Sequence, residues 1–157
     1  MQQNLQQQQK NLKNNMSYAI DIIKKYEGLS LKAYRCPAGI VTIGYGCTTY
    51  PDGTPVKMGD TITKEKAEAL LLDYVINQIM PHLKDLALTS NQEAALCSLI
   101  YNIGAPAFLK SKCYKAIKAK DWETVYKEWE WTKAGGKTLK GLLKRRSEER
   151  YLFFSDI

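Results

Sequence analysis

Apolar residues recur at helical spacing early in the chain and then give way to alternation. The first periodic set precedes a glutamate and a glycine and consists of Ile20, Ile22, Ile23 and Tyr26. Ser17 is a favourable N-cap, so the sequence predicts a helix from Ser17 to about Glu27. Gly28 fits the position that follows such a helix, where a positive φ is common.

Two short runs of strand-forming residues come after this helix. Residues 32–36 and 40–45 flank the turn-forming triplet Pro37-Ala38-Gly39, so the sequence predicts a tight hairpin. Residues 54–58 could add a third strand. A sheet of two or three strands is not stable alone and needs helices to cover it.

Helical patterns dominate from residue 61 onward. Thr63 can cap a long helix that Pro81 would end, and this helix is expected to connect a sheet lobe with a helical lobe. Residues 90–93 resemble a capping box that opens an unusually apolar helix, which is expected at the centre of the second lobe. Three further helices are expected near residues 107–118, 121–131 and 138–153.

The N-terminal segment differs in composition from the rest of the chain. Residues 1–15 hold six Gln, four Asn, two Lys and no acidic residue. Such a segment cannot form a core of its own, so we expect a disordered extension over residues 1–16 and one domain over residues 17–157. Leu5 and Leu12 lie seven residues apart, which leaves a helical extension onto a neighbouring molecule open as an alternative.

Composition excludes several classes of protein. Hydrophobic residues make up 45% and charged residues 25% of the 157, values typical of one soluble globular domain. No run of about 18 apolar residues is present, and the N-terminus lacks the apolar core of a signal peptide. We therefore expect neither a transmembrane helix nor an export signal.

The positive charge is concentrated in the C-terminal third. The net charge is +7, and residues 110–150 hold 13 of the 23 basic but only 6 of the 16 acidic residues. Such a surface attracts polyanions, with nucleic acid and an anionic wall polymer as candidates and a simple solvated face as the alternative. No nucleic-acid-binding motif is recognisable.

The cysteines give no indication of a metal site. The chain has four, without a CxxC pair or a histidine cluster, so no metal is expected. In a reducing cytoplasm they would remain thiols. They are Cys36, Cys47, Cys97 and Cys113.

Three polar side chains are concentrated in the predicted helix and hairpin: Glu27, Cys36 and Thr42. With a three-residue loop, Cys36 lies opposite Ile40, and alternate strand residues point to one face. That face would hold Tyr34, Cys36, Ile40, Thr42 and Gly44. A single carboxyl group beside a small polar pair could supply one acid and hold one water.

This stretch resembles the signature of phage-type lysozymes, glycoside hydrolase family 24. The pattern of that family is a Glu, eight residues, an Asp or Cys, five residues and a Thr, which Glu27, Cys36 and Thr42 match. The resemblance covers roughly residue 17 to the C-terminus. Further matches are residues 43–46, 101–104 and 141–142, with Phe108, Ser111, Trp131, Gly135, Gly136, Arg145, Arg146 and Glu149.

The resemblance implies a fold and three catalytic roles. The fold would be α+β and lysozyme-like, with a cleft between a small antiparallel sheet lobe and a mostly helical lobe. Glu27 would protonate the leaving oxygen, and Thr42 would hold the attacking water. Cys36 stands where other members carry Asp, and it could position water, act as a partly ionised base, or merely fit, because a thiol with an ordinary pKa of about 8.5 is mostly neutral at pH 7. No metal or organic cofactor is needed.

Looser matches imply contacts with the substrate. Gly44 and Gly46 would let a saccharide approach the sheet, and Tyr101 could stack on a sugar or equally be a core residue. Arg145 or Arg146 could be a partner of Glu27, because the family has an arginine from the last helix near its catalytic acid. The expected substrate-binding residues are Tyr34, Gly44, Gly46, Thr48, Tyr101 and Ser111.

The function implied by the resemblance is that of a muramidase. It would hydrolyse the β-1,4 bond between N-acetylmuramic acid and N-acetylglucosamine in peptidoglycan by general acid catalysis with direct water attack. Such an endolysin would remain in the host bacterial cytoplasm until a holin gives access to the wall. It would act as a monomer on peptidoglycan, without nucleic acid or stable membrane insertion. The alternatives are a non-catalytic wall-binding protein and a glycosidase that acts on chitin-like polymers.

Overall fold

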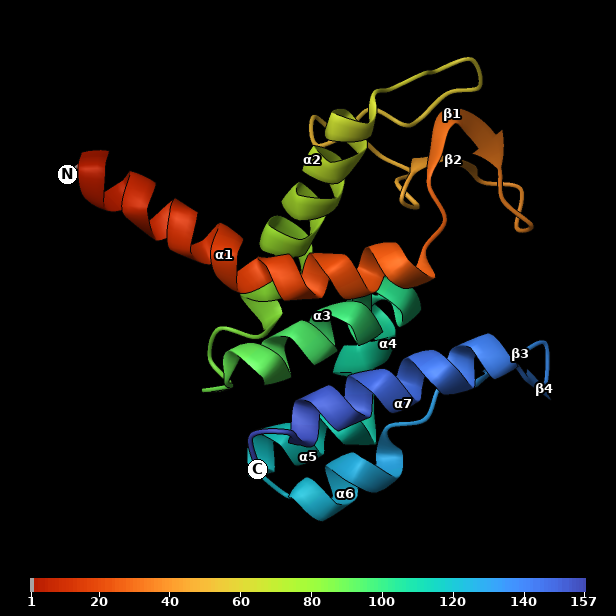
Figure 1. Ribbon diagram of the computed structural model, residues 1–157. Coiled ribbons are helices and arrows are strands. Elements are labelled where there is room, and N and C mark those ends of the chain that lie inside the picture. Colours follow the sequence, from red (N-terminus) through yellow and green to blue (C-terminus); the bar gives the residue numbers. More distant parts are fainter. Residues whose placement is uncertain (1) are drawn as a thin grey trace. The chain divides into compact units, whose positions relative to one another are not determined.

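The computed structural model describes residues 2–157, apart from the side chains of residues 8–15. The chain divides into two compact units, Met1–Gln78 and Ile79–Ile157. The first unit contains both strands of the predicted hairpin, and the second is mostly helical (Figure 1). No helix of the described residues is long and apolar enough to cross a membrane.

The first unit is built from two helices and one hairpin. Its elements are α1 (Gln2–Tyr26), β1 (Ser30–Arg35), β2 (Val41–Gly44) and α2 (Lys64–Tyr74). Lys24 of α1 forms an ion pair of 2.7 Å with Glu68 of α2, which ties the two helices together. A turn of π-helix (Val75–Ile79) follows α2 and contains the boundary between the units.

Helix α1 begins much earlier than the sequence predicts. It starts at Gln2 instead of Ser17, so the described backbone of the expected disordered extension is helical, while the side chains of residues 8–15 lie outside the described part. Met16 is fully buried and so belongs to the core of the unit. The division at residue 16 remains a prediction. The helix ends just before Gly28 as predicted, but Gly28 is not among the glycines with positive φ, so that part of the expectation is wrong.

The hairpin has the expected register near its turn. Tyr34 pairs with Thr42, and the Cys36 amide donates to the Ile40 carbonyl oxygen at 2.9 Å. An irregularity between Ser30 and Tyr34 shifts the register toward the base of the hairpin. The four residues of β2 are half-buried or buried, whereas β1 is mostly exposed.

The third strand does not form at residues 54–58. Pro55 lacks an amide hydrogen and makes only an isolated bridge with Thr49. The free edge of β1 is instead met by an isolated bridge between Lys32 and Thr61. The Ile62 amide donates to the Leu31 carbonyl oxygen at 2.9 Å, which adds to this contact.

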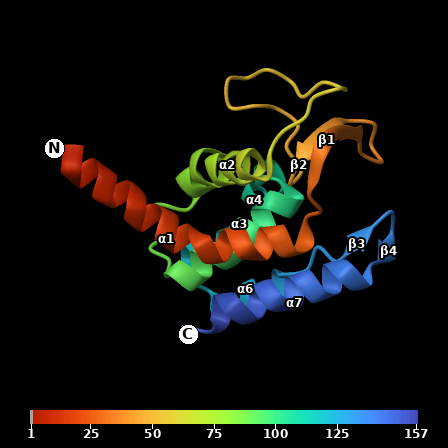
Figure 2. The same ribbon diagram turned by 45° about the horizontal axis from the view of Figure 1, so that its top comes forward.

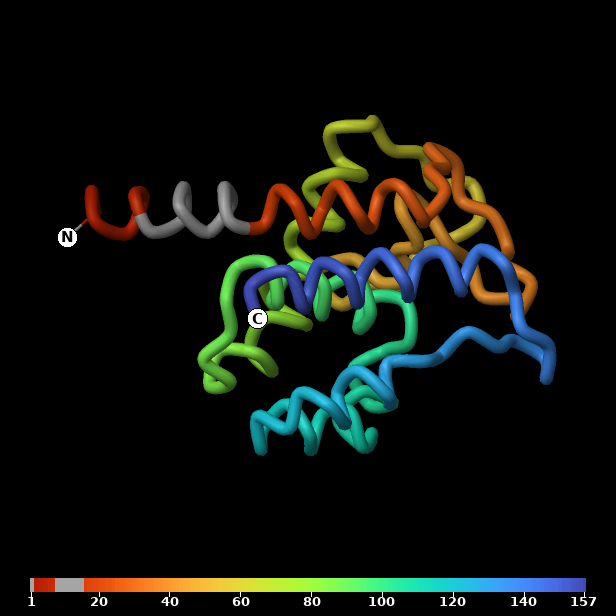
Figure 3. Tube along the Cα trace, turned by 60° about the horizontal axis from the view of Figure 1, so that its bottom comes forward, coloured from red at the N-terminus to blue at the C-terminus, as the bar shows by residue number. Residues whose placement is uncertain are grey.

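The second unit contains one apolar helix with shorter helices around it. After a 3-10 turn (Met80–His82) come α3 (Ser90–Ile103), α4 (Ala105–Leu109), α5 (Lys112–Ala119), α6 (Trp122–Glu128), the two-residue strands β3 (Lys133–Ala134) and β4 (Lys137–Thr138), and α7 (Lys140–Phe154). Helix α3 is buried over most of its length and packs against α7. Helices α5 and α6 lie side by side in the same unit (Figure 3), and β3 and β4 lie at the start of α7 (Figure 2).

Several predicted helix boundaries are wrong by a few residues. Helix α2 ends at Tyr74, where the π-helical turn takes over, so Pro81 lies in the 3-10 turn and does not end α2. The capping box of α3 uses Thr89 with Gln92 in place of the register that starts at Ser90. One expected helix is split into α4 and α5 because Ser111 caps a new helix.

Candidate active site

Helix α1 places Glu27 at the base of the hairpin. The residue follows Tyr26 directly, and its amide donates to the Ile23 carbonyl oxygen at 2.8 Å, as in a further turn of helix. Its side chain is half-buried, and β1 begins three residues later at Ser30. Residue 27 therefore stands between the end of a helix and the start of a strand.

The hairpin turn surrounds the sulfur of Cys36 with hydrogen-bond donors. Gly39 adopts a φ of +81°, and its amide donates to the Cys36 carbonyl oxygen at 2.7 Å, which closes the turn. The amide of Ile40 lowers the pKa of the Cys36 thiol below its ordinary value, and the amide of Ala38 and the hydroxyl of Thr42 act in the same direction. The turn thus favours an anion at this position.

Thr42 has one hydroxyl proton and two acceptors for it. Its Oγ1 donates to the Ile40 carbonyl oxygen at 3.0 Å, and it is also a hydrogen-bond partner of the Cys36 sulfur. A hydroxyl donates only one proton, so ionisation of Cys36 can draw that proton away from the carbonyl. The side chain is only 5% exposed. The structure therefore brings Cys36 and Thr42 together as expected.

The other site residues predicted in the first unit differ in their surroundings. Tyr34 is 41% exposed, and Thr48 and Gly46 are exposed, so all three are open to a ligand. Gly44 is buried and has a φ of +66°, and a Cβ atom there would lie 3.4 Å from Cδ1 of Ile62. The backbone fold by itself thus accounts for a glycine at this position, and its contact with a saccharide remains a prediction.

Two of the predicted substrate-binding residues belong to the second unit, one on α3 and one at the N-cap of α5. Tyr101 is half-buried on α3. Ser111 accepts a hydrogen bond from the Tyr114 amide at 3.0 Å and donates to the Phe108 carbonyl oxygen at 2.6 Å. Its hydroxyl proton is therefore used by the fold, and one acceptor position remains for a ligand.

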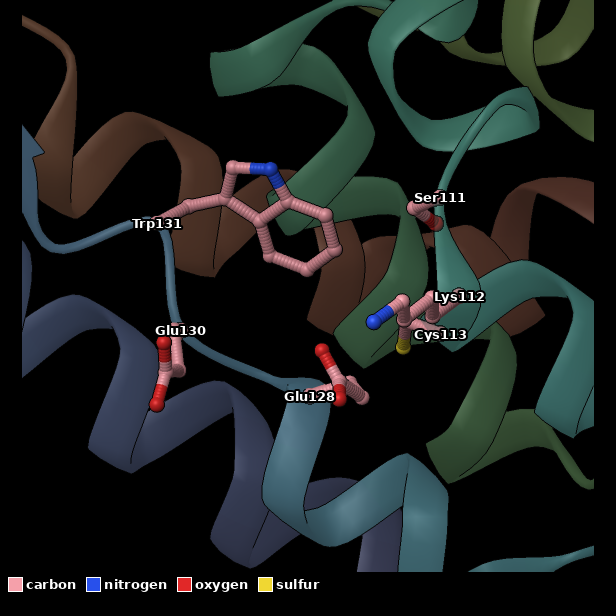
Figure 4. Close-up of a pocket in the computed structure, with 6 residues that line it drawn as sticks. All are labelled: Ser111, Lys112, Cys113, Glu128, Glu130 and Trp131. Atoms are coloured by element: carbon pink, nitrogen blue, oxygen red, sulfur yellow. The ribbon is translucent and has the colours of Figure 1, made fainter.

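Ser111 also borders a pocket of about 270 Å³ in the second unit. Lys112 and Glu128 point toward each other across this pocket, and the ring of Trp131 forms another wall (Figure 4). Trp131 has a φ of +53°, a strained conformation for a bulky residue. The remaining lining residues are Cys113 and Glu130. An aromatic ring with charges of both signs suits a polar ligand that also has an apolar face.

Arg145 and Arg146 belong to a buried network centred on Glu149. Arg146 Nε lies 2.9 Å from Glu149 Oε1, and Arg145 Nε lies 3.3 Å from Glu149 Oε2. The side chains are 3%, 1% and 0% exposed in chain order. Burial raises the pKa of Glu149, and the two guanidiniums act against that rise. Two cations thus share one buried carboxylate.

Three further residues complete this network. Ser98 of α3 donates its hydroxyl proton to Glu149, and Asn102 accepts from Arg146 at 2.9 Å. The Trp129 indole donates to Glu149 at 3.5 Å. The sequence analysis did not identify this centre, although the spacing of Arg145 and Arg146 from Glu149 is that of helical ion pairs. A pairing of either arginine with Glu27 remains a prediction.

The described residues contain no group of three or more His, Cys, Asp or Glu side chains that could hold a metal ion.

Cys97 and Cys113 are buried, and burial raises the pKa of Cys113 to about 12. They are therefore inert core residues. Cys36 is the cysteine whose surroundings favour the thiolate, which supports a chemical role for it alone.

The comparisons with known proteins cover all these residues. The phage lysozyme family matches residues 24–149, a range that includes Glu27, Cys36, Thr42 and the Glu149 network. The endolysin of Acyrthosiphon pisum secondary endosymbiont phage 1 is 40% identical over 141 residues, which cover 85% of this chain and 93% of that protein.

Solved structures agree with this match. The endolysin from Escherichia coli phage FAHEc1 aligns with a TM-score of 0.77 and 36% identity, over 90% of this chain and 93% of that chain. The muramidase domain of SpmX from Asticaccaulis excentricus aligns with a TM-score of 0.75 and 30% identity, over 88% of this chain and 96% of that chain. The α+β lysozyme-like fold class is therefore confirmed, and the chain belongs to the phage lysozyme family.

Proposed function

We propose that the protein is an endolysin with muramidase activity, which cleaves the β-1,4 bond between N-acetylmuramic acid and N-acetylglucosamine in peptidoglycan. One observation carries the proposal. A helix end presents Glu27 at the base of a hairpin whose turn stabilises an anion on Cys36 beside the hydroxyl of Thr42. The family membership supports a lysozyme-type glycoside hydrolase.

The residues would divide the reaction between an acid and a water-holding pair. Glu27 gives its proton to the glycosidic oxygen as the bond between that oxygen and the anomeric carbon breaks. A water held by Thr42 attacks the anomeric carbon from the opposite face. The thiolate of Cys36 accepts a proton from that water, so the step needs no covalent enzyme intermediate and inverts the configuration.

The second unit has a candidate binding site of its own. The pocket beside Ser111 offers Trp131 as an apolar wall, with Lys112 and Glu128 for polar groups. We place a saccharide unit with its attached peptide there. Tyr34, Gly46 and Thr48 would contact the glycan near the bond that is cleaved.

The proposal also covers the setting in which the enzyme acts. It would accumulate in the host bacterial cytoplasm, and a holin would give it access to the wall. It would work there as a monomer and without a cofactor. The relatives named endolysin support a role in host cell lysis.

Digestion of purified peptidoglycan by the protein and by Glu27→Gln tests the assignment. The parent should release new reducing muramic acid ends, identified by mass spectrometry, and the variant should release none. Glu65→Gln, which removes the same charge from an exposed position on α2, is the matched control and should retain activity. Equal digestion by the parent and by Glu27→Gln, or products cut at peptide bonds, would refute the mechanism.

A further inference from the structure

Helix α5 and the short segments before and after it carry a dense group of lysines. No acidic residue occurs between Glu93 and Asp121, and five lysines fall within eleven residues at the end of this stretch. All five are exposed. We call them the lysine face: Lys110, Lys112, Lys115, Lys118 and Lys120.

The fold fixes this face to the outside of the second unit. Cys113, Ala116 and Ile117 are the buried residues of α5, and they anchor the opposite side of the helix in the core. Ser111 caps the start of the helix, and Lys120, with a φ of +56°, ends it. A helix rises 1.5 Å per residue, so Lys112 and Lys118, the first and last lysines within α5, are separated by roughly 9 Å along its axis.

The lysines of the lysine face form no close ion pairs in the described part of the protein, although Lys112 faces Glu128 across the pocket. Among the residues that the structure describes, none of the five lysines forms an ion pair, in contrast to Lys24 with Glu68 and Lys127 with Glu123. Lys118 lies over the ring of Tyr114 at 4.6 Å, a contact that leaves its charge in place. The lysine face is therefore open to an anionic partner.

The lysine face continues into the pocket of the second unit. Lys112 belongs to both, because its amino group points into the pocket from the start of α5 (Figure 4). A polymer that fills the pocket can therefore extend along α5 and meet the other lysines. A substrate bound in the pocket would therefore lie next to the lysine face.

We propose that the lysine face binds the carboxylates of the peptides in peptidoglycan and so holds the polymer beside the pocket. The inference rests on the proposed function. Exposed lysines on a convex helix act as separate point charges, which suits a flexible polymer with carboxylates on mobile side branches.

Two other polyanions fit the surface less well. A membrane surface would favour exposed apolar residues for insertion, and the large exposed hydrophobic residues of the described chain lie outside residues 110–120. A nucleic acid would favour exposed aromatic rings for stacking, whereas Tyr114 is half-buried under Lys118. Binding of peptide carboxylates requires only the positive charges that the lysine face provides.

Binding to insoluble peptidoglycan measures this role apart from catalysis. The triple variant Lys110→Gln, Lys115→Gln and Lys118→Gln spares Lys112, and each variant is prepared in the Glu27→Gln background so that the polymer is not digested. Cosedimentation at low salt should show affinity lowered roughly tenfold, the effect of three exposed ion pairs. The difference should shrink at high salt because the charges are screened.

A second triple variant controls for net charge. Lys57→Gln, Lys84→Gln and Lys133→Gln remove three exposed lysines from elsewhere, and binding should change less than twofold. Conversion of the carboxylates of peptidoglycan to amides should weaken binding by the Glu27→Gln protein that retains all five lysines. Its affinity should then equal that of the first triple variant. With Glu27 restored, the first variant should show a raised KM and an unchanged kcat.

Several results would overturn the inference. They are equal binding by the two triple variants, no effect of amidation, or a loss seen on phosphatidylglycerol vesicles but not on peptidoglycan. Failure of the proposed function is a separate result: the protein with Glu27 would release no reducing ends, whatever the binding data show.

Discussion

At the scale of single residues, the turn explains how a cysteine can occupy a position at which the family pattern also accepts an aspartate. The amides of Ile40 and Ala38 point at the side chain of residue 36, and they would serve a carboxylate as well as a thiolate. The Gly39 amide closes the turn through the Cys36 carbonyl oxygen, which leaves the other two amides for the side chain. The two residue types therefore differ chiefly in the pH at which the anion forms.

Replacement of Cys36 should separate the roles open to it. Cys36→Ser keeps the size but has no anion in the working range, so kcat should fall at least tenfold at pH 8 if the thiolate is the base. In the parent, activity should rise with pH through the lowered pKa of the thiol, because the thiolate is the higher-pH form. Cys36→Asp should restore activity and move this rise to lower pH. The measurement is the kcat profile from pH 4 to 9.

Cys47→Ser is the matched control for this series. Cys47 is also half-buried in the first unit, but burial raises the pKa of its thiol, so its removal should change neither kcat nor the pH profile. An unchanged rate and profile for Cys36→Ser would mean that the thiol only fills space.

At the scale of elements, Gly44 lies where the base of the hairpin packs against α2. Gly44→Ala should lower the free energy of unfolding by about 1–2 kcal/mol, because an alanine at a φ of +66° is strained. Its Cβ would make only ordinary van der Waals contacts with Ile62 and Ala67, so the cost comes from the backbone conformation. Gly28→Ala is the control, since it has no neighbour within 4 Å and lies outside the region of positive φ. Urea unfolding measures both, and equal stabilities would contradict this account.

The sequence indicates the elements whose signal is local. The hairpin turn, the buried positions of α1 and the apolar character of α3 follow from residue spacing alone. The limits of α2 and α3 do not, because alternative caps and a π-helical turn have similar local energies and packing decides between them. The third strand failed because the free edge of β1 is met by residues that no strand pattern marks.

The site was predictable to the same extent. The closeness of Cys36 and Thr42 follows from their spacing within one hairpin, whereas the choice of Glu27 rests on the family resemblance. The pocket lined by Lys112, Glu128 and Trp131 joins segments that only the fold brings together, so spacing could not reveal it.

At the scale of the whole molecule, a charged centre stabilises the second unit. Glu149→Gln would leave two buried guanidiniums with no carboxylate between them, so the free energy of unfolding should fall by about 3–5 kcal/mol. Glu123→Gln removes the same charge from an exposed helical pair and should cost about 0.5 kcal/mol or less. Tryptophan fluorescence during urea unfolding reports both variants, and a loss below about 1 kcal/mol for Glu149→Gln would contradict the assigned role.

The same centre affects how the chain can fold as it is synthesised. Ser98 and Asn102 meet their partners Glu149 and Arg146 only across 51 and 44 residues of chain. A nascent chain that has emerged from the ribosome as far as α6 therefore has α3 without its charged partners. The second unit can complete its interior only when α7 has left the exit tunnel. A chain that stops before α7 would lack this centre.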